Sequence, residues 1–262
     1  MTLSDPNPEK IGVLLKSLQI DFEYYPELDS TNKKAKEIAE KKQLAQDRLI
    51  MAGCQTGGYG RYGRSFSSPA RGGIYLSLIH QLPAGTPLNP GLITTAAAVA
   101  VSRTIHQQLD LDPQIKWVND ILVDGQKVCG ILAEAVLDSR SQAVQAVVLG
   151  IGINYLTSED SFAPALLQRV GTLKKAAEQA GCSLTDFTIQ LCSNLNELLG
   201  PDTSASDFMP EYRRRSAVIG RQVTLTLGER KISGLVKDIN DQGELVLADG
   251  QVFGSGEVTK VR

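Results

Sequence analysis

The sequence predicts an α+β fold, in which a mixed β-sheet backed by helices precedes a small C-terminal β-barrel. Three observations lead to this prediction. Helical and strand-like patterns both occur in the first 215 residues, a glycine-rich segment connects two strand-like runs, and the chain changes to short alternating strands after the arginine run at 213–215. We therefore expect a larger domain at residues 1–215 and a smaller one at residues 216–262.

The composition is that of an ordinary globular protein. Of the 262 residues, 42% are apolar and 21% are charged, which suits one substantial core with a small additional domain. The 27 basic and 29 acidic residues give a formal charge of −2, so there is no general attraction for nucleic acid or for an anionic membrane. Any anion site must be local.

We expect the protein to be cytoplasmic. Its four cysteines show neither the short spacing of a metal site nor the density of a disulfide scaffold, so they are expected to be reduced thiols. The N-terminus, MTLSDPNPEK, lacks the pattern of a signal peptide, and no apolar run has the length needed to span a bilayer.

The elements of the larger domain follow from local patterns. Cap-forming residues at 29–32 (DSTN) precede a helix over 33–42, and a strand over 49–55 enters the glycine-rich segment. An aromatic and β-branched run over 73–82 predicts the next strand, and the alanine-rich stretch 91–109 predicts a core helix because it contains no internal Gly or Pro.

Further strands are expected over 115–118, 127–137 and 143–154, separated by DGQ and DSRSQ. Asp124 and Gly125 can both adopt positive φ, which predicts a tight hairpin turn between the first two of these runs. Helices fit 172–180 and 184–199. Residues 220–261 then alternate as about five short strands of a barrel, with turns at Gly228, 241–243 and 249–250.

The glycine-rich segment, QTGGYGRYGR at 55–64, has two readings. Its glycines expose backbone N–H groups and its arginines can pair with phosphate or carboxylate, so it can hold an anion. It can equally be a solvated basic hairpin. It is not a dinucleotide fingerprint, because a loop and a strand follow it where that motif requires a helix.

Two further motifs are also ambiguous when taken singly. KWVND at 116–120 can direct Lys116 into a pocket, or Lys116 and Trp117 can simply alternate on a strand before a turn. GIGIN at 150–154 can bring backbone close to a ligand with Asn154 beside it, or it can be a bulge that ends an apolar strand.

Taken together and in order, these motifs resemble those of biotin protein ligases. The resemblance rests on STN at 30–32, the glycine-rich segment, KWVND at 116–120, KVCGIL at 127–132 and GIGIN at 150–154, followed by a small barrel. It extends from about Asp29 to the C-terminus. It implies a catalytic domain of the class II synthetase and biotin ligase type with an SH3-like C-terminal barrel, which agrees with the fold predicted from the residues.

The resemblance implies a two-step reaction. Biotin and MgATP would give biotinyl-5′-adenylate, and a lysine of the biotin carboxyl carrier protein of acetyl-CoA carboxylase would then receive biotin. The implied catalytic residues are Lys116, Arg61 and Arg64, with Lys116 central. The implied biotin-binding residues are Ser30, Thr31, Asn32, Gln55, Tyr59, Gly60, Arg61 and Lys116. The implied ATP- and adenylate-binding residues are Gly58, Arg61, Arg64, Lys116, Asn119 and Asn154. The Mg²⁺ ligands are not assigned, although Asp120 is a candidate.

This sequence departs from the family pattern at three positions. Tyr59 stands where arginine is frequent, which changes one contact to biotin or phosphate and affects how tightly the adenylate is retained. Val118 replaces a usual proline, and Phe66 replaces a frequent tryptophan. Neither of the last two changes removes a predicted catalytic charge.

Other functions fit the sequence less well. A lipoate or octanoate ligase would need a long apolar slot, which the polar residues 30–32 and Gln55 argue against. An RNA-binding function of the barrel is disfavoured, because its strands carry acidic residues and few aromatics.

Only 29 residues precede Ser30, so we expect the monofunctional type of ligase, which has no N-terminal DNA-binding domain and does not bind DNA. We expect no membrane association and either a monomer or a homodimer.

Overall fold

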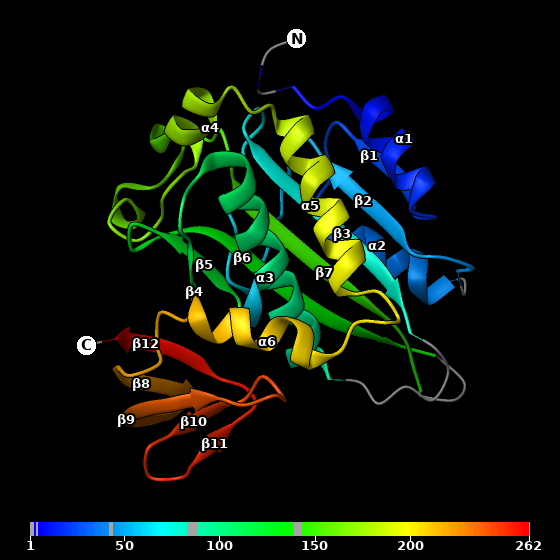
Figure 1. Cartoon of the computed structure of the whole chain (residues 1–262). Coiled ribbons are helices and arrows are strands. Elements are labelled where there is room, and N and C mark those ends of the chain that lie inside the picture. The colour runs from blue at the N-terminus through cyan, green and yellow to red at the C-terminus, as the bar shows by residue number, and fades with distance from the viewer. Residues whose placement is uncertain (1–2, 4, 42–43, 83–88, 139–142, 262) are drawn as a thin grey trace.

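The computed structural model describes residues 3, 5–41, 44–82, 89–138 and 143–261. A seven-stranded mixed sheet with helices forms the larger part, and a five-stranded sheet follows it (Figure 1). The predicted α+β fold is therefore confirmed. None of the helices in these ranges combines the length and apolarity that crossing a bilayer requires.

The large sheet is antiparallel except at one edge, where the first two strands are parallel. Both faces of its central strands are covered, so these strands read as nearly continuous apolar runs. From one edge to the other the order is β1 (Asp21–Tyr25), β2 (Arg48–Ala52), β3 (Gly73–Gln81), β7 (Val144–Asn154), β6 (Gln126–Leu137), β5 (Asp120–Val123) and β4 (Gln114–Lys116).

Helices cover both faces of this sheet. The α-helices are α1 (Pro8–Ser17), α2 (Thr31–Lys41), α3 (Pro90–Leu109), α4 (Lys174–Ala180), α5 (Leu184–Leu198) and α6 (Ala205–Arg214). The larger apolar core lies on the side of α3, α5 and α6, and α2 packs against the opposite face of β3 and β7 (Figure 1). Short 3₁₀ turns occur at η1 (Arg61–Gly63), η2 (Glu159–Ser161) and η3 (Pro164–Leu166).

The local signals explain where several elements begin and end. The Asn89 side chain accepts a hydrogen bond from the Leu92 amide and caps α3, which then ends at Asp110 in the left-handed conformation. Asp124 and Gly125 have φ values of 51° and 76°, as the predicted hairpin turn between β5 and β6 requires.

The small C-terminal sheet packs against the larger domain. Its antiparallel order is β11 (Val252–Phe253), β10 (Leu245–Leu247), β9 (Arg230–Ile239), β8 (Gln222–Leu227) and β12 (Glu257–Val261). The buried Trp117 indole donates a hydrogen bond of 3.0 Å to the Gly243 carbonyl, and the Arg213 guanidinium donates one of 2.6 Å to the Ile239 carbonyl. The two parts are therefore connected by buried as well as surface contacts.

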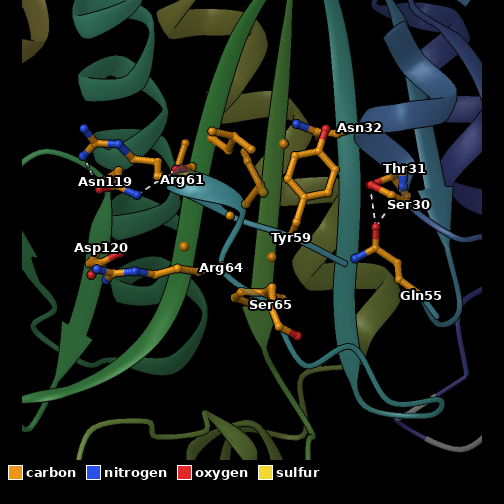
Figure 2. A pocket seen from close by; sticks show the side chains of 18 of the residues that line it. Ser30, Thr31, Asn32, Gln55, Tyr59, Arg61, Arg64, Ser65, Asn119 and Asp120 are labelled. Carbon is orange, nitrogen blue, oxygen red and sulfur yellow. Dashed lines mark hydrogen bonds between the residues drawn. The ribbon is translucent and has the colours of Figure 1, made fainter. Parts of the chain in front are cut away.

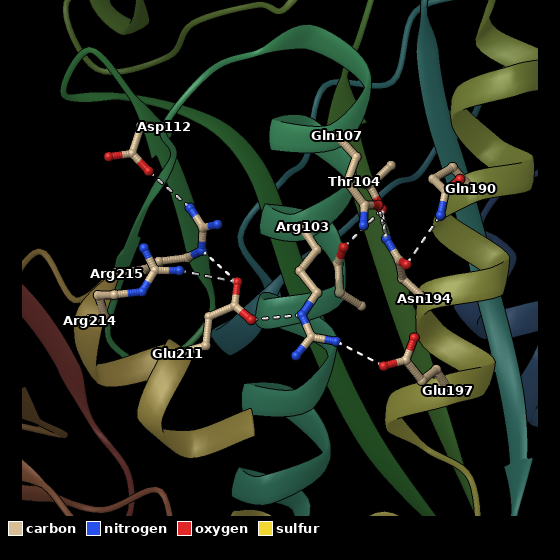
Figure 3. A network of polar contacts seen from close by, with 11 residues as sticks. Arg103, Thr104, Gln107, Asp112, Gln190, Asn194, Glu197, Glu211, Arg214 and Arg215 are labelled. Atoms are coloured by element: carbon tan, nitrogen blue, oxygen red, sulfur yellow. Dashed lines mark hydrogen bonds and ion pairs between the residues drawn. The ribbon is translucent and has the colours of Figure 1, made fainter. Parts of the chain in front are cut away.

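A polar network ties α6 to the core immediately before this sheet (Figure 3). The Glu211 carboxylate accepts hydrogen bonds from Arg103 on α3 and from Arg215, at 2.7 and 2.9 Å. Burial alone would raise the pKa of Glu211, but these two guanidinium groups outweigh it and lower the pKa. Glu211 is therefore held as a carboxylate between two elements.

The sequence located most elements within a few residues. It missed β1, β5 and α6, because β1 and β5 are short and α6 contains Pro210. The turn expected at DSRSQ, residues 138–142, lies almost entirely outside the described residues.

Candidate active site

A cavity of about 200 Å³ opens on the α2 side of the large sheet, beneath the glycine-rich loop (residues 55–66). The loop crosses above β6 and β7, and the start of α2 forms one end of the cavity (Figure 2). Its lining residues are Ser30, Thr31, Asn32, Gln55, Tyr59, Gly60, Arg61, Tyr62, Arg64, Ser65, Phe66, Leu76, Asn119, Asp120, Lys127, Gly130, Ile131, Leu132, Gly150, Ile151, Gly152 and Glu257.

One end of the cavity is polar and uncharged. Ser30, Thr31 and Asn32 are buried at the start of α2. The Thr31 amide donates to Gln55 Oε1 at 2.8 Å, and Gln55 Nε2 donates to Ser68 Oγ at 2.9 Å, so both ends of the Gln55 amide are fixed. These groups offer hydroxyl and amide partners to a neutral polar ligand.

The other end is charged, and Figure 2 shows it separated from the neutral end by Tyr59. Arg64 forms two hydrogen bonds to Glu257 at 2.5 and 2.6 Å, and Lys127 Nζ lies 2.6 Å from Asp120 Oδ1. Arg61 donates to Asn119 Oδ1 at 3.3 Å. Three cations therefore face two carboxylates, which leaves this end with an excess of positive charge.

Glu257 comes from the C-terminal sheet. Its hydrogen bonds from Arg64 lower its pKa, and the nearby charges of Lys116 and Arg61 lower it further, while burial opposes this shift. The small domain thus contributes a carboxylate to the cavity.

Glycines on β6 and β7 make room for this arrangement. A Cβ atom on Gly150 would lie 2.1 Å from Asn32 Oδ1, and a Cβ atom on Gly152 would lie 2.6 Å from the Phe66 ring. GIGIN was read as allowing backbone to approach a ligand. The structure shows that these glycines also admit the protein's own side chains at the cavity wall.

Lys127, which was not among the predicted site residues, lines the cavity. A β-bulge in β6 explains its position, because Leu122 pairs with Lys127 while the preceding Ile121 pairs with Cys129. The extra residue, Val128, turns Lys127 to the same face as Gly130, whose added Cβ would lie 3.2 Å from Lys127 Nζ. The quoted KVCGIL motif contained this lysine, but strict alternation would have placed it on the opposite face.

Lys116 does not share this position. It ends β4 and pairs in register with Asp120, and the cavity lining of the described residues includes Lys127 but not Lys116. Its charge is close enough to Glu257 to lower the pKa of that carboxyl. Lys116 therefore lies outside the lining but close to Glu257, and its expected role as the central electrostatic residue stays a prediction.

Two other predicted residues also lie outside the lining. Asn154 is buried, and its side-chain amide donates to the Gly171 carbonyl at 3.0 Å, so it braces the loop after β7. A Cβ on Gly58 would lie 2.7 Å from Ser68 Oγ, so this glycine serves the packing of the loop. The remaining predicted residues line the cavity: Ser30, Thr31, Asn32, Gln55, Tyr59, Gly60, Arg61, Arg64 and Asn119.

No metal-binding cluster accompanies these residues. Within the described ranges, no group of three or more His, Cys, Asp or Glu side chains is arranged to hold an ion. Asp120 does line the cavity, but it is paired with Lys127.

Comparison with known proteins identifies the family. A family model described as "Biotin/lipoate A/B protein ligase family" matches residues 24–154, and one described as "Biotin protein ligase C terminal domain" matches residues 218–261. The chain is 36% identical over 154 residues to the "Bifunctional ligase/repressor BirA" of Bacillus subtilis (strain 168), covering 59% of this chain and 46% of that protein. It thus spans about half the length of that relative.

Two other similarities cover more of both chains. The "Biotin--[acetyl-CoA-carboxylase] ligase" of Mycobacterium tuberculosis (strain ATCC 25618 / H37Rv) is 30% identical over 227 residues, covering 82% of this chain and 79% of that protein. The structure of the biotin protein ligase from Aquifex aeolicus in complex with biotin and ATP has a TM-score of 0.71 at 24% identity, with 92% and 98% of the chains covered. This chain therefore belongs to the biotin/lipoate A/B protein ligase family.

Proposed function

We propose that this protein activates biotin with ATP to form biotinyl-5′-adenylate and then transfers biotin to a lysine of the biotin carboxyl carrier protein of acetyl-CoA carboxylase. The observation that supports this most is a single cavity with a neutral hydrogen-bonding end and a cationic end. Biotin has the matching polarity, because it has a neutral ureido ring at one end, a carboxylate at the other, and an apolar body between them.

The neutral end suits the ureido ring. Ser30 and Thr31 offer hydroxyl groups, and the fixed Gln55 amide limits how a ligand can orient there. The apolar side chains of Leu76, Leu132 and Ile151 would contact the body of biotin. The valerate carboxylate would then reach the cationic end.

The cationic end suits the first chemical step. A biotin carboxylate oxygen forms a bond to the α-phosphorus of ATP, and the bond from that phosphorus to the bridging oxygen of pyrophosphate breaks. The approaching groups are both anionic, so Arg61, Arg64 and Lys127 would neutralise the charge that accumulates in the transition state. We assign to Lys127 the central role first expected of Lys116, because Lys127 lines the cavity.

The second step is an acyl transfer. The neutral amine of the carrier lysine would attack the carbonyl carbon of the adenylate, and AMP would leave. The glycine-rich loop covers the cavity and would protect the mixed anhydride from water until the carrier arrives.

Mg²⁺ would enter with ATP. Asp120 and Glu257 offer carboxylate oxygens at the cationic end, which suits this ion, but each already pairs with a cation. Mg²⁺ usually retains water and takes one or two carboxylates together with substrate phosphates. We therefore propose that the phosphates supply most of its ligands, with Asp120 as the nearest protein ligand.

A lipoate or octanoate ligase is the alternative within the same family. A fatty acyl chain would place apolar methylene groups against the hydroxyl and amide groups of the neutral end, which disfavours it. The match of residues 218–261 to the C-terminal domain of biotin protein ligases also favours biotin.

We also propose the division into a catalytic domain at 1–215 and a C-terminal domain at 216–262. For the four free cysteines we propose a reducing, cytoplasmic setting.

The test is pyrophosphate release from MgATP with biotin, lipoate or octanoate supplied separately, with and without a biotin carrier domain. We expect release with biotin alone, followed by biotin on the carrier lysine. Release only with a fatty acid would move the assignment to lipoate or octanoate ligation, and no release with any acid would refute an adenylating function.

A further inference from the structure

One carboxylate joins three separate elements beside the cavity. Glu134 lies on β6, and its Oε2 accepts hydrogen bonds from Asn32 Nδ2 on α2 at 2.8 Å and from the Tyr59 hydroxyl at 2.9 Å. Its Oε1 lies 2.7 Å from Lys36 Nζ, also on α2. Sheet, helix and glycine-rich loop therefore meet at this side chain.

The charge states of the group favour these contacts. Burial would raise the pKa of Glu134, but hydrogen bonds from Lys36, Asn32 and Tyr59 outweigh it and lower the pKa. Burial and the neighbouring Glu134 carboxylate raise the pKa of Tyr59, so its phenol keeps the proton it donates. Hydrogen bonds to an ionised acceptor are stronger than those between neutral groups.

Tyr59 is well placed to transmit this restraint to the loop. Its ring lines the cavity between the neutral and the cationic ends (Figure 2), and Lys36 Nζ lies 5.8 Å from the ring centroid. Tyr59 forms a bridge with Ser65, and the adjacent Gly60 amide donates to the Arg64 carbonyl at 2.8 Å. Fixing the Tyr59 side chain thus fixes both arms of the loop.

The same carboxylate acts on the neutral end. Because Asn32 Nδ2 donates to Glu134, Asn32 Oδ1 faces Ser77 Oγ at 2.5 Å, and Ser77 Oγ lies 2.8 Å from Thr31 Oγ1. A continuous polar chain therefore runs from the loop through Glu134 to the hydroxyl that faces Gln55.

We propose that Tyr59 is a positioning residue, whose hydroxyl, held by Glu134 and Lys36, fastens the glycine-rich loop over the cavity and slows the escape of the adenylate. These three residues form the Glu134 clamp. The proposal rests on the proposed function, since it concerns retention of the intermediate formed there. It predicts that the clamp affects retention of biotin and adenylate more than the chemical step.

The first test is Tyr59→Phe, which keeps the ring and removes only the hydroxyl. Loaded protein is diluted into a trap, and the rate of biotinyl-adenylate release is compared with the rate of transfer to the carrier. We expect release about tenfold faster, because one hydrogen bond to an ionised acceptor is lost. The KM for biotin should rise in parallel, while single-turnover adenylate formation at saturating biotin should change little.

The chain provides a matched control in Tyr25→Phe. The Tyr25 hydroxyl also donates to a glutamate, Glu23 at 2.6 Å, and Lys34 Nζ lies 5.7 Å from its ring, but Tyr25 is on β1 and does not line the cavity. The Tyr25→Phe variant should release adenylate at the same rate as the parent. If Tyr59→Phe and Tyr25→Phe accelerated release equally, the effect would be a general loss of stability, and the proposal would be overturned.

Glu134→Gln and the double variant complete the test. If the two side chains act as one unit, the double variant should release adenylate no faster than the more impaired single variant, whereas additive effects would contradict the clamp. Should Tyr59→Phe fail to fold, Lys36→Met leaves the phenol and removes the cation, and it should also accelerate release. If the parent forms adenylate and the variants release it no faster than the parent does, the clamp alone is refuted. If the parent forms no adenylate, both the proposed function and the clamp are refuted.

Discussion

Lys127 on β6 and Lys116 on β4 belong to the same sheet, with β5 between them, yet the structure gives them different positions. The bulge in β6 turns Lys127 toward the cavity, where it pairs with Asp120. Lys116 remains at the end of β4 and affects Glu257 through its charge. One extra residue in a strand therefore decides which of the two lysines lines the cavity.

Replacing these lysines should separate their roles. Lys127→Gln should reduce the rate of biotin-dependent pyrophosphate release about a hundredfold, because a fixed charge opposite the developing negative charge is lost. Lys116→Gln should reduce the rate by less than about tenfold, since it acts through Glu257. Single-turnover kinetics at saturating biotin and ATP measure both rates, and the reverse ranking would restore Lys116 to the central role.

The glycines of the cavity wall make a second residue-scale prediction. A Cβ in Gly152→Ala would displace the Phe66 ring from above the cavity, since the two would be 2.6 Å apart. We expect a raised KM for biotin with a smaller change in the KM for ATP. Gly12→Ala is the control. Gly12 lies in α1, and its added Cβ would lie at an ordinary contact distance of 3.5 Å from Phe22 on β1. This variant should retain activity and gain slightly in stability, because alanine favours a helix more than glycine does. A normal biotin KM in Gly152→Ala would show that Phe66 does not shape the site.

Residue types predicted the chemistry better than they predicted the positions. STN at 30–32 and the loop arginines line the cavity; local patterns marked them as a helix cap and a glycine-rich segment, and the resemblance to biotin protein ligases singled them out as site residues. Lys127 was missed because a bulge is not visible in an alternating pattern, and Glu134 was missed because its partners, Asn32 and Tyr59, are distant in sequence. Contacts between distant segments cannot be read from local patterns.

At the scale of elements, α6 connects the two sheets. Glu211 on this helix is shared between Arg103 of α3 and Arg215, and its side chain is only 18% exposed. Removing its charge leaves Arg103 with Glu197 and Arg215 with Asp112, both of which are largely exposed carboxylates. The network therefore fixes the helix from which the C-terminal sheet begins (Figure 3).

Glu211→Gln should destabilise the protein by about 3 kcal/mol at pH 7, since one partner of a largely buried ion-pair network is removed. The folded-state pKa of Glu211 is lowered, so its stabilisation is complete above the unfolded-state pKa, about 4.3, and is lost as the pH falls through the folded value. The difference between parent and variant in urea unfolding should shrink below about pH 4. A difference independent of pH would mean that the carboxylate charge is not the cause.

The long elements were predictable, whereas β1, β5 and α6 were not. The alanine-rich helix α3 and the apolar strands β3, β6 and β7 follow from sustained patterns. β5 has only four residues, and α6 contains Pro210, so neither segment shows a clear periodic pattern of apolar residues in the sequence. Their structure depends on tertiary contacts such as those of Glu211.

At the scale of the whole molecule, the C-terminal sheet completes the cavity. The turn between β9 and β10 is held by Trp117 and Arg213, and the sheet so placed directs Glu257 to Arg64. The sequence predicted a small barrel but assigned it no residue in the site, because nothing local distinguishes Glu257 from other surface carboxylates.

Glu257→Gln should raise the KM for ATP about two- to fivefold, a modest effect because the partner Arg64 is 65% exposed. Glu229→Gln, at an exposed position in the turn between β8 and β9, is the control and should match the parent. Steady-state kinetics with varied ATP make the comparison, and equal KM values in all three proteins would remove the C-terminal sheet from the active site.

The central claim is that one cavity holds biotin and ATP and joins them. Its most direct test is to mix the protein with biotin and MgATP, quench the reaction within one turnover, and quantify biotinyl-5′-adenylate in the parent and in Lys127→Gln. We predict adenylate approaching the amount of enzyme in the parent and very little in the variant. A parent that binds both substrates but forms no adenylate would contradict the account.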